Sequence, residues 1–288
     1  MKTAIACASG SAKGVFVHGV IDALIRQGLA VDAFAASSSS TIPAAFAAAG
    51  RLDALAGPAY WQRTADAFKE RKDVSDSIAW VIAQFVPILR ESLFLPDARR
   101  FILAASHVKS ADAAEKCQGL QARRAGLDQL ALARKKDGTW ADANLVTHLF
   151  DTQPRPPTRP LTAENLADAL YATTRMMHAW KAAGWIDGLP YVDASYTCSC
   201  PAIEMAELGY DRVVAISPET GPFYRDLYQR EVLPPEWKAA RISFIQPEID
   251  LKTMGVDYLF AEDGALGRAF AAGRAAGTRF LDSSPIMR

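Results

Sequence analysis

Four consecutive serines, Ser37–Ser40, stand between a short apolar run, Val31–Ala35, and an alanine-rich segment that ends near Gly50. A serine at the junction of a strand and a helix can attack an ester carbonyl when a base accepts its proton. The same residues also fit a serine-rich loop in which Ser40 or Thr41 caps the following helix. Taken alone, the segment favours the capping loop, so nucleophilic chemistry needs support from elsewhere in the chain.

A second candidate is the turn Ser9-Gly10-Ser11-Ala12-Lys13-Gly14, which joins a predicted strand to a predicted helix. Its small residues let backbone N–H groups point outward, and the helix N-terminus adds positive potential. Such a turn can hold a phosphate or stabilise an oxyanion. Neither the dinucleotide fingerprint nor the closing Gly-Lys-Ser/Thr of a P-loop is present, so a nucleotide-binding α/β protein is only an alternative.

A third candidate is Asp193, in the run Tyr191-Val192-Asp193-Ala194-Ser195 that leads through Pro201 into a predicted helix. An aspartate at the carboxyl end of a parallel strand faces the ligand crevice of an open α/β sheet. For a single aspartate, however, a turn or cap role is commoner. Asp187, followed by Gly188, is a rival base, but it lacks the spacing to Pro201.

These candidates need elements to position them, and the first fifty residues indicate strand, helix, strand, helix. Residues 3–8 and 31–35 are short apolar runs that suit buried strands, and helical patterns follow both. Successive βα units imply parallel strands with right-handed crossovers. We therefore predict an α/β fold with a mostly parallel central sheet and helices on both faces.

The remaining chain continues in the same style, with no repeat and no linker that marks a second domain. Residues 105–160 are polar and irregular, and Gln153–Pro160 is a proline-rich loop. The apolar segment Asp76–Leu103 favours buried core helices over a lid or an acyl-chain surface. Further strands are predicted at Tyr191–Val192, Val213–Ile216 and Arg241–Gln246, and further helices at Thr162–Thr174, Pro201–Leu208 and Phe260–Phe280.

Composition excludes several classes of protein. The 288 residues carry a net charge of zero, without the basic excess of a nucleic-acid-binding protein. The cysteines are too few for a disulfide framework and lack a neighbouring cluster that would complete a zinc site, so no metal is expected. The N-terminus is too short for a signal-peptide core before Ser9, and no apolar stretch could cross a bilayer, which favours a cytoplasmic protein.

Together, the three candidate segments resemble the patatin-like phospholipase family, in a bacterial type with substituted glycine motifs. That family has a Gly-Gly-Gly-x-Lys/Arg-Gly oxyanion loop, a Gly-x-Ser-x-Gly elbow and an Asp-Gly-Gly/Ala motif. The matching segments here are Ser9–Gly14, Ala36–Ser40 and Gly188–Ser195, and the resemblance covers residues 3–50 and 165–217. It implies a three-layer α/β/α fold and a single acyl hydrolase domain over residues 1–288.

The resemblance also implies roles for individual residues. Ser38 would be the nucleophile and Asp193 its base, in a dyad that uses no histidine. The N–H groups of the oxyanion hole would come from Gly10, Ser11 and Ser39. Lys13 would either hold the loop or contact an anionic head group of the substrate.

The implied function is a serine acyl hydrolase, a lipase, phospholipase or esterase, that cleaves carboxylic esters of lipids through an acyl-enzyme. It would need no cofactor, would take a lipid or acyl-ester substrate and would contact a membrane surface transiently. Glycines of all three motifs are replaced here by serine or alanine. These departures leave an acyltransferase, or an inactive acyl-binding protein of the same fold, as alternatives. A Ser-His-Asp triad is a further alternative, with His178 as its candidate.

Overall fold

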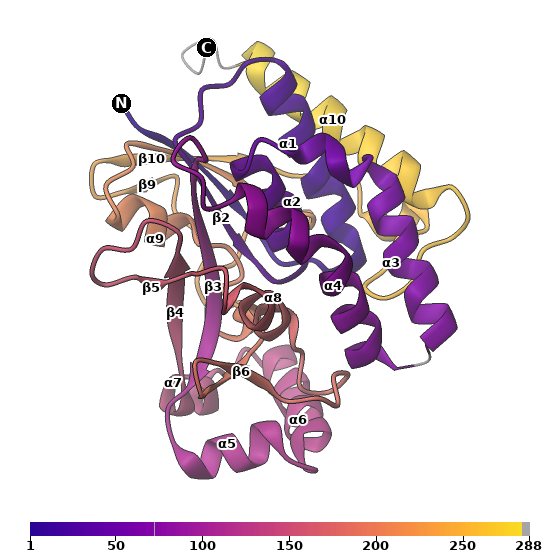
Figure 1. Ribbon diagram of the computed structural model, residues 1–288, viewed down its shortest axis with the longest axis vertical. Helices are drawn as coiled ribbons and strands as arrows, with labels where there is room; N and C mark the ends of the chain where they lie inside the picture. Colours follow the sequence, from indigo (N-terminus) through magenta and orange to yellow (C-terminus); the bar gives the residue numbers. More distant parts are fainter. Residues whose placement is uncertain (72, 284–288) are drawn as a thin grey trace.

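The computed structural model describes residues 1–71 and 73–283 of the chain. It is built on a sheet in the order β5-β4-β3-β2-β1-β8-β10-β9, with the hairpin β6–β7 joined to β3 (Figure 1). The strands are β1 (Thr3–Cys7), β2 (Ala33–Ser37), β3 (Arg100–Val108), β4 (Leu145–Asp151), β5 (Arg159–Pro160), β6 (Gly184–Ile186), β7 (Leu189–Val192), β8 (Arg212–Ile216), β9 (Glu236–Trp237) and β10 (Ala240–Ile245). The central run from β3 to β10 is parallel, which confirms the predicted α/β fold.

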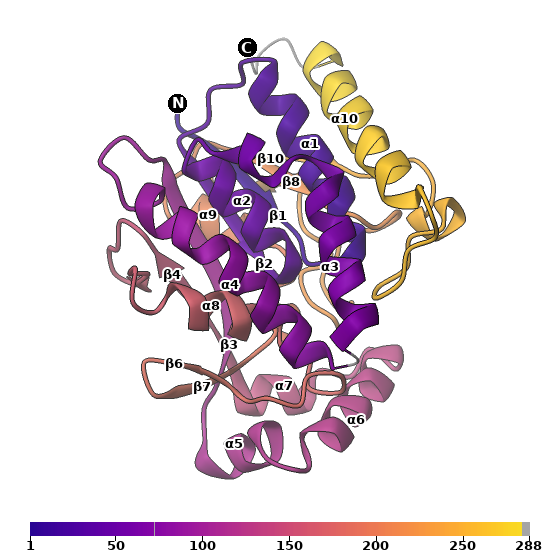
Figure 2. The same ribbon diagram turned by 45° about the vertical axis from the view of Figure 1, so that its right-hand side comes forward.

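Helices cover both faces of this sheet, as the three-layer prediction requires (Figures 1 and 2). Most of them, including α1, α2, α4 and α10, pack on one face, and α9 packs on the other. The helices are α1 (Gly14–Arg26), α2 (Thr41–Ala48), α3 (Pro58–Arg71), α4 (Val74–Ser92), α5 (Ala111–Gln118), α6 (Ala122–Arg134), α7 (Thr139–Asn144), α8 (Leu166–Thr174), α9 (Ala202–Glu207) and α10 (Ala265–Ser283). Short 3-10 turns are η1 (Ser11–Lys13), η2 (Ser38–Ser40), η3 (Leu52–Leu55), η4 (Ala194–Tyr196) and η5 (Leu251–Met254).

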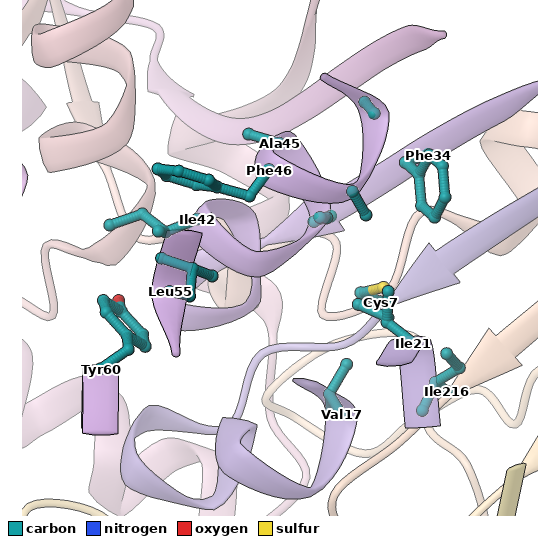
Figure 3. Packing of buried hydrophobic residues seen from close by; sticks show 14 of the residues in the cluster. Cys7, Val17, Ile21, Phe34, Ile42, Ala45, Phe46, Leu55, Tyr60 and Ile216 are labelled. Atoms are coloured by element: carbon teal, nitrogen blue, oxygen red, sulfur yellow. The ribbon is translucent and has the colours of Figure 1, made fainter. Parts of the chain in front are cut away.

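Strand β1 shows why the sheet is buried on both sides. Ile5 and Cys7 belong to the cluster under α1 and α2, whereas Ala4 and Ala6 belong to the cluster under α9. Successive side chains of a strand point to opposite faces, so a strand with a layer on each side needs an unbroken apolar run. In Figure 3, Cys7 lies beside Ile21 of α1 and near its β8 neighbour, Ile216.

Helices α1 and α10 approach each other closely through glycines. A Cβ at Gly19 would lie 2.2 Å from the carbonyl oxygen of Phe270, and one at Gly273 would lie 2.1 Å from that of Phe16. Only glycine allows backbones to come this near. Helix α10 thus packs directly on α1, the helix of the first βα unit, on the side away from the sheet (Figure 2).

Two sequence predictions need correction. Residues 105–160 are not irregular, because they contain the end of β3, three short helices and β4. Strand β4 is only partly buried, and α5 to α7 present mainly polar residues to solvent, so no long apolar run marked them. Asp193 does not follow a parallel strand, because β7 pairs antiparallel with both β3 and β6.

Other expectations are met in part. The apolar segment after Asp76 forms α4, whose residues Val81, Phe85 and Leu89 are buried in the core, but its last residues enter β3. Residues 153–158 form a loop, while Arg159 and Pro160 pair with β4. The C-terminal helix begins at Ala265 rather than near Phe260. The cysteines are buried free thiols, and none of the helices in residues 1–71 and 73–283 has the length and hydropathy of a membrane span.

Candidate active site

The serine run forms a sharp elbow between β2 and α2. Ser37 is extended, with φ −123° and ψ 143°, whereas Ser38 has φ +54°. A non-glycine residue in the left-handed region is strained and persists only where its surroundings hold it. Because β1 and β2 pair in parallel from Ala4 and Ala33 to Cys7 and Ala36, the elbow and the Ser9–Gly14 turn emerge at the same edge of the sheet.

The side chains of the four serines go to four different places. Ser37 Oγ donates to the carbonyl oxygen of Cys198 at 2.8 Å, and Ser40 Oγ donates to that of Ala8 at 2.6 Å. Ser39 Oγ is buried without a hydrogen-bond partner among the described residues. Only Ser38 reaches a carboxylate: its Oγ donates to Asp193 Oδ2 at 2.8 Å.

Asp193 is prepared to accept a proton. It is 1% exposed, and its other carboxylate oxygen, Oδ1, accepts the N–H of Ser195 at 2.8 Å. Burial raises the pKa of the Asp193 carboxyl to about 6, although the hydrogen bonds from Ser195 and Ser38 favour its ionised form. A carboxyl with this pKa is ionised at neutral pH and is a stronger base than an exposed aspartate.

The rival base is held elsewhere. Asp187 lies in the turn between β6 and β7, with φ +50°, and its Oδ2 accepts a hydrogen bond from Asn165 at 3.0 Å. It makes no hydrogen bond with Ser38. Asp187 thus has a turn role. Asp193 also has the cap role expected for a single aspartate, because it is the N-cap of η4 and its side chain accepts the N–H of Ser195.

The turn before α1 supplies backbone N–H groups beside the elbow. Ser11 has φ +49°, and both Gly10 and Ser11 line a cavity that also contains Ser38 and Asp193. The first N–H groups of η1 and η2 have no partner within their own short helices. The motif keeps two glycines, and each has a steric reason: a Cβ at Gly10 would lie 2.4 Å from the ring of Pro218, and one at Gly14 would lie 2.6 Å from the ring of Trp61.

Lys13 is buried beneath the turn and does not line the cavities around Ser38. Its Nζ contacts Glu219 Oε2 at 2.8 Å and Asp250 Oδ1 at 3.2 Å, and it lies 5.1 Å from the ring centre of Tyr258. These partners occupy the ammonium group. Lys13 thus ties the turn to the segments after β8 and β10.

None of the four histidines forms a hydrogen bond with Ser38 or Asp193. His18 accepts a hydrogen bond from Trp61 in the core, and burial lowers its pKa to about 3. His107 stacks on His148 between β3 and β4. His178 lines the same cavity as Ser38, but its Nδ1 has no hydrogen-bond partner among the described residues.

A narrow apolar cleft opens on one side of Ser38. Its volume is about 50 Å³, and Ser11, Ser38 and Ser39 lie at its base. Ile78, Val81 and Ile82 of α4 form part of its wall, so the apolar face of that helix serves both the core and the cleft. Other apolar residues of the wall are Ile42, Tyr60, Trp61, Phe68, Leu170 and Leu266.

A wider cavity also borders the nucleophile, and we call it the polar cavity because it has a larger share of polar groups in its lining than the cleft. Its volume is about 490 Å³, within the usual range of small-molecule sites. Ser11, Ser38, Trp180, Tyr258 and Leu259 line both spaces, so the hydroxyl of Ser38 stands where the cleft and the cavity meet.

Sequence reasoning gave no role to several residues of the site. Thr173 Oγ1 accepts the N–H of Ser38 at 2.9 Å, and its own hydroxyl donates to the carbonyl oxygen of Ala104 at 2.6 Å. Thr173 lies in the segment Ala172-Thr173-Thr174, outside the three candidate motifs. Trp180 and Tyr258 lie in segments without a motif, and no pattern marks them.

The comparisons with known proteins name no relative. No family model matches the chain, and a search of curated proteins finds no significant match. Among residues 1–71 and 73–283, no group of three or more histidine, cysteine or acidic side chains could hold a metal ion. Function is therefore inferred from the geometry around Ser38.

Proposed function

We propose that the protein is a serine acyl hydrolase that cleaves carboxylic esters with Ser38 as nucleophile and Asp193 as base. The observation that carries this proposal is the 2.8 Å hydrogen bond from Ser38 Oγ to Asp193 Oδ2, made by a serine with φ +54° at a strand-to-helix junction. A buried carboxylate accepting from a strained serine is the arrangement that nucleophilic catalysis needs. The resemblance of the three sequence segments to patatin-like phospholipases supports the same assignment.

The reaction would proceed in two stages. Ser38 Oγ attacks the ester carbonyl as its proton passes to Asp193, and N–H groups of Gly10, Ser11 and Ser39 stabilise the oxyanion. Asp193 returns the proton to the departing alcohol, which leaves Ser38 acylated. Water then attacks the acyl carbon, with Asp193 accepting its proton, and the carboxylic acid leaves as Ser38 recovers its hydrogen.

The apolar cleft supports an acyl group as the part of the substrate that becomes bound to Ser38. Apolar side chains bury a hydrocarbon chain favourably, at about 0.8 kcal/mol for each CH₂. At about 50 Å³ the cleft is narrow. Leu259 and Phe260, which also line the cleft, are exposed to solvent. We expect short acyl esters to be the better first substrates.

The direct test is hydrolysis of p-nitrophenyl butyrate by the purified protein and three variants. Ser38→Ala and Asp193→Asn should each reduce kcat/KM by at least about 10³, because nucleophile and base act together. Asp187→Asn is the matched control and should keep the wild-type rate, since its carboxylate bonds to Asn165. Equal loss in all three variants, or full activity in Ser38→Ala, would contradict the proposal.

A fluorophosphonate probe separates an active site from an inactive binding site. Covalent labelling at Ser38, abolished in Ser38→Ala, is expected for a reactive hydroxyl. An acyltransferase would also be labelled, but would form the transfer product when given an acceptor alcohol. Free acid as the main product, with an acceptor present, is the result expected for a hydrolase.

A further inference from the structure

The polar cavity beside Ser38 is the place where the alcohol part of an ester would lie. The apolar cleft suits the acyl part, and the two spaces meet at the nucleophile. At about 490 Å³, the cavity has room for a small polar alcohol. Its lining therefore bears on which esters the enzyme accepts, and this inference rests on the proposed function.

The charged lining of the cavity is acidic. Its wall contains the carboxylates of Asp193, Glu219 and Asp226, whereas none of its described residues is lysine or arginine. A phosphate in this space would meet carboxylates and no opposing cation. Recognition of phosphate in proteins normally uses arginine, lysine or unpaired backbone N–H groups. The N–H groups here lie beside Ser38, where the oxyanion forms.

Lys13 and Arg230, the cations that pair with carboxylates of the wall, each contact a second carboxylate as well. Lys13 contacts both Glu219 and Asp250, at 2.8 and 3.2 Å. Arg230 contacts Asp142 and Asp226, at 2.6 and 3.3 Å. When ionised, each cluster carries a net negative charge. Even when Lys109, which lies beside Asp142, is counted, these pairs leave no net positive charge at the wall.

Arg225 and Lys136 lie outside the lining, and Arg225 is paired with Glu204 and Glu231 at 3.3 and 3.5 Å. The ammonium of Lys136 stands over the Tyr224 ring, 5.6 Å from its centre. Burial, with a contribution from the charge of Arg123, lowers the pKa of His178, so the one basic side chain in the wall is neutral at pH 7. Among the described residues that line it, the cavity therefore has no positive side chain to receive an anion.

Aromatic faces and hydroxyl groups lie in the wall beside aliphatic side chains such as Leu130, Met176 and Leu227. Trp180 is 5% exposed, lines the cavity, and its Nε1 is buried without a hydrogen-bond partner among the described residues. An unpaired indole N–H suits a hydroxyl or ester oxygen of a ligand. Aromatic rings next to carboxylates also attract organic cations. The other groups of this kind are Tyr224, Tyr258, Ser195, Ser199, Ser217 and Thr220.

We propose that this cavity selects the alcohol part of the ester by charge, and that the substrates are esters of uncharged or cationic alcohols rather than phosphate-bearing ones. The carboxylates of Glu219 and Asp226 repel an anionic alcohol, and the aromatic and hydroxyl groups receive a polyol or a quaternary ammonium group. The enzyme is thus an esterase of neutral or cationic esters, and a phospholipid head group is a poor fit.

The test compares three soluble butyrate esters that share the acyl group. They are glyceryl monobutyrate, butyrylcholine and the butyrate ester of glycerol 3-phosphate. We expect kcat/KM for the first two to exceed that for the phosphate ester by at least about tenfold. One unit charge at about 8 Å, with an effective dielectric constant of about 30, has an effect of that size. Equal or faster cleavage of the phosphate ester would overturn the proposal.

Two charge variants test the cause of the preference. Asp226→Asn and Glu219→Gln should each raise the ratio of kcat/KM for the phosphate ester over the glyceryl ester, by roughly tenfold. Asp53→Asn, which removes a carboxylate paired with Arg26 on the far side of α1, should leave the ratio unchanged. An unchanged ratio in both cavity variants would contradict the charge explanation.

A binding measurement keeps this inference separate from the proposed function. Choline and glycerol 3-phosphate are titrated into Ser38→Ala, with tryptophan fluorescence as the signal and Ser38→Ala/Trp180→Phe as the reference. Tighter binding of choline supports the selection even if no ester is cleaved. Tighter binding of glycerol 3-phosphate would overturn it, whereas failure of hydrolysis alone would count against the proposed function.

Discussion

The hydroxyl of Thr173, at the end of α8, holds the backbone of Ser38. Its Oγ1 accepts the N–H of Ser38 at 2.9 Å, and its hydrogen goes to the carbonyl oxygen of Ala104 in β3 at 2.6 Å. This pair of hydrogen bonds fixes the strained elbow between helix and sheet. It also occupies the Ser38 N–H, so the oxyanion must be stabilised by other N–H groups.

Thr173→Val should damage both stability and activity, because it removes the acceptor while keeping the shape. A buried N–H left unpaired costs about 1–3 kcal/mol, and we expect a loss of this size in the free energy of unfolding by urea. We expect kcat for p-nitrophenyl butyrate to fall more than KM rises. Thr173→Ser, which keeps the hydroxyl, is the matched control, and equal losses in both variants would rule out the hydrogen bond as the cause.

The φ angle of Ser38 predicts an unusual order of stabilities. The free energy of unfolding of Ser38→Gly should exceed that of Ser38→Ala by about 1 kcal/mol in urea titrations, because only glycine adopts φ +54° without strain. Both variants lack the hydroxyl, so the loss of the hydrogen bond to Asp193 cancels when their free energies of unfolding are compared. At Ser40, where φ is −78°, alanine should be at least as stable as glycine. An alanine variant more stable than glycine at position 38 would contradict the elbow geometry.

The pKa of Asp193 predicts the pH dependence of the reaction. The base must be ionised to accept the proton of Ser38, so kcat/KM should fall about tenfold for each pH unit below about 6 and level off above it. An initial-rate series from pH 4.5 to 8 with p-nitrophenyl butyrate measures this. A profile that is flat between pH 4.5 and 7 would exclude Asp193 as the base.

The raised pKa of Asp193 also predicts that its ionised carboxylate lowers the free energy of unfolding at neutral pH. The folded pKa is about 6 and the ordinary value is 3.8, so the folded protein binds more protons between these pH values. The free energy of unfolding therefore decreases as pH rises from about 4 to 6. Asp193→Asn should be more stable than the wild type at pH 8, by up to about 3 kcal/mol, and gain little at pH 4. Urea titrations at both pH values measure the difference, and a gain that is equal at both would contradict it.

The glycines of α10 offer a test of the close packing against α1. Gly273→Ala should lower the free energy of unfolding by about 1–3 kcal/mol, because the new Cβ would lie 2.1 Å from a backbone oxygen of Phe16. Gly267→Ala, in the same helix with no heavy atom within 4 Å of the added Cβ, should be neutral or slightly stabilising. Similar effects of the two substitutions would contradict the packing of α10 on α1.

Local patterns predicted the local parts of the fold well. The apolar runs of β1, β2 and β8 and the helical stripe of α1 were visible because each depends on neighbours in sequence. Residues 105–160 were predicted wrongly as irregular because α5 to α7 are mainly polar and bury only small or polar side chains, so no run of large apolar residues marks them. The direction of β7 could not be predicted either, because an apolar strand has the same sequence pattern in parallel and antiparallel pairs.

In the candidate site too, some features could be predicted from the sequence and others depend on the tertiary structure. The sequence by itself predicted the three local motifs of the site, because each consists of neighbouring residues. They are the turn Ser9–Gly14, the elbow Ala36–Ser40 and the segment that contains Asp193. The resemblance singled out Ser38 among the four serines, but its contact with Asp193, 155 residues away, depends on the tertiary structure, which sets one φ angle and one hydrogen bond. The pairing of Lys13 with Glu219 and Asp250 was decided there too, because only the order of strands in the sheet brings such distant segments together.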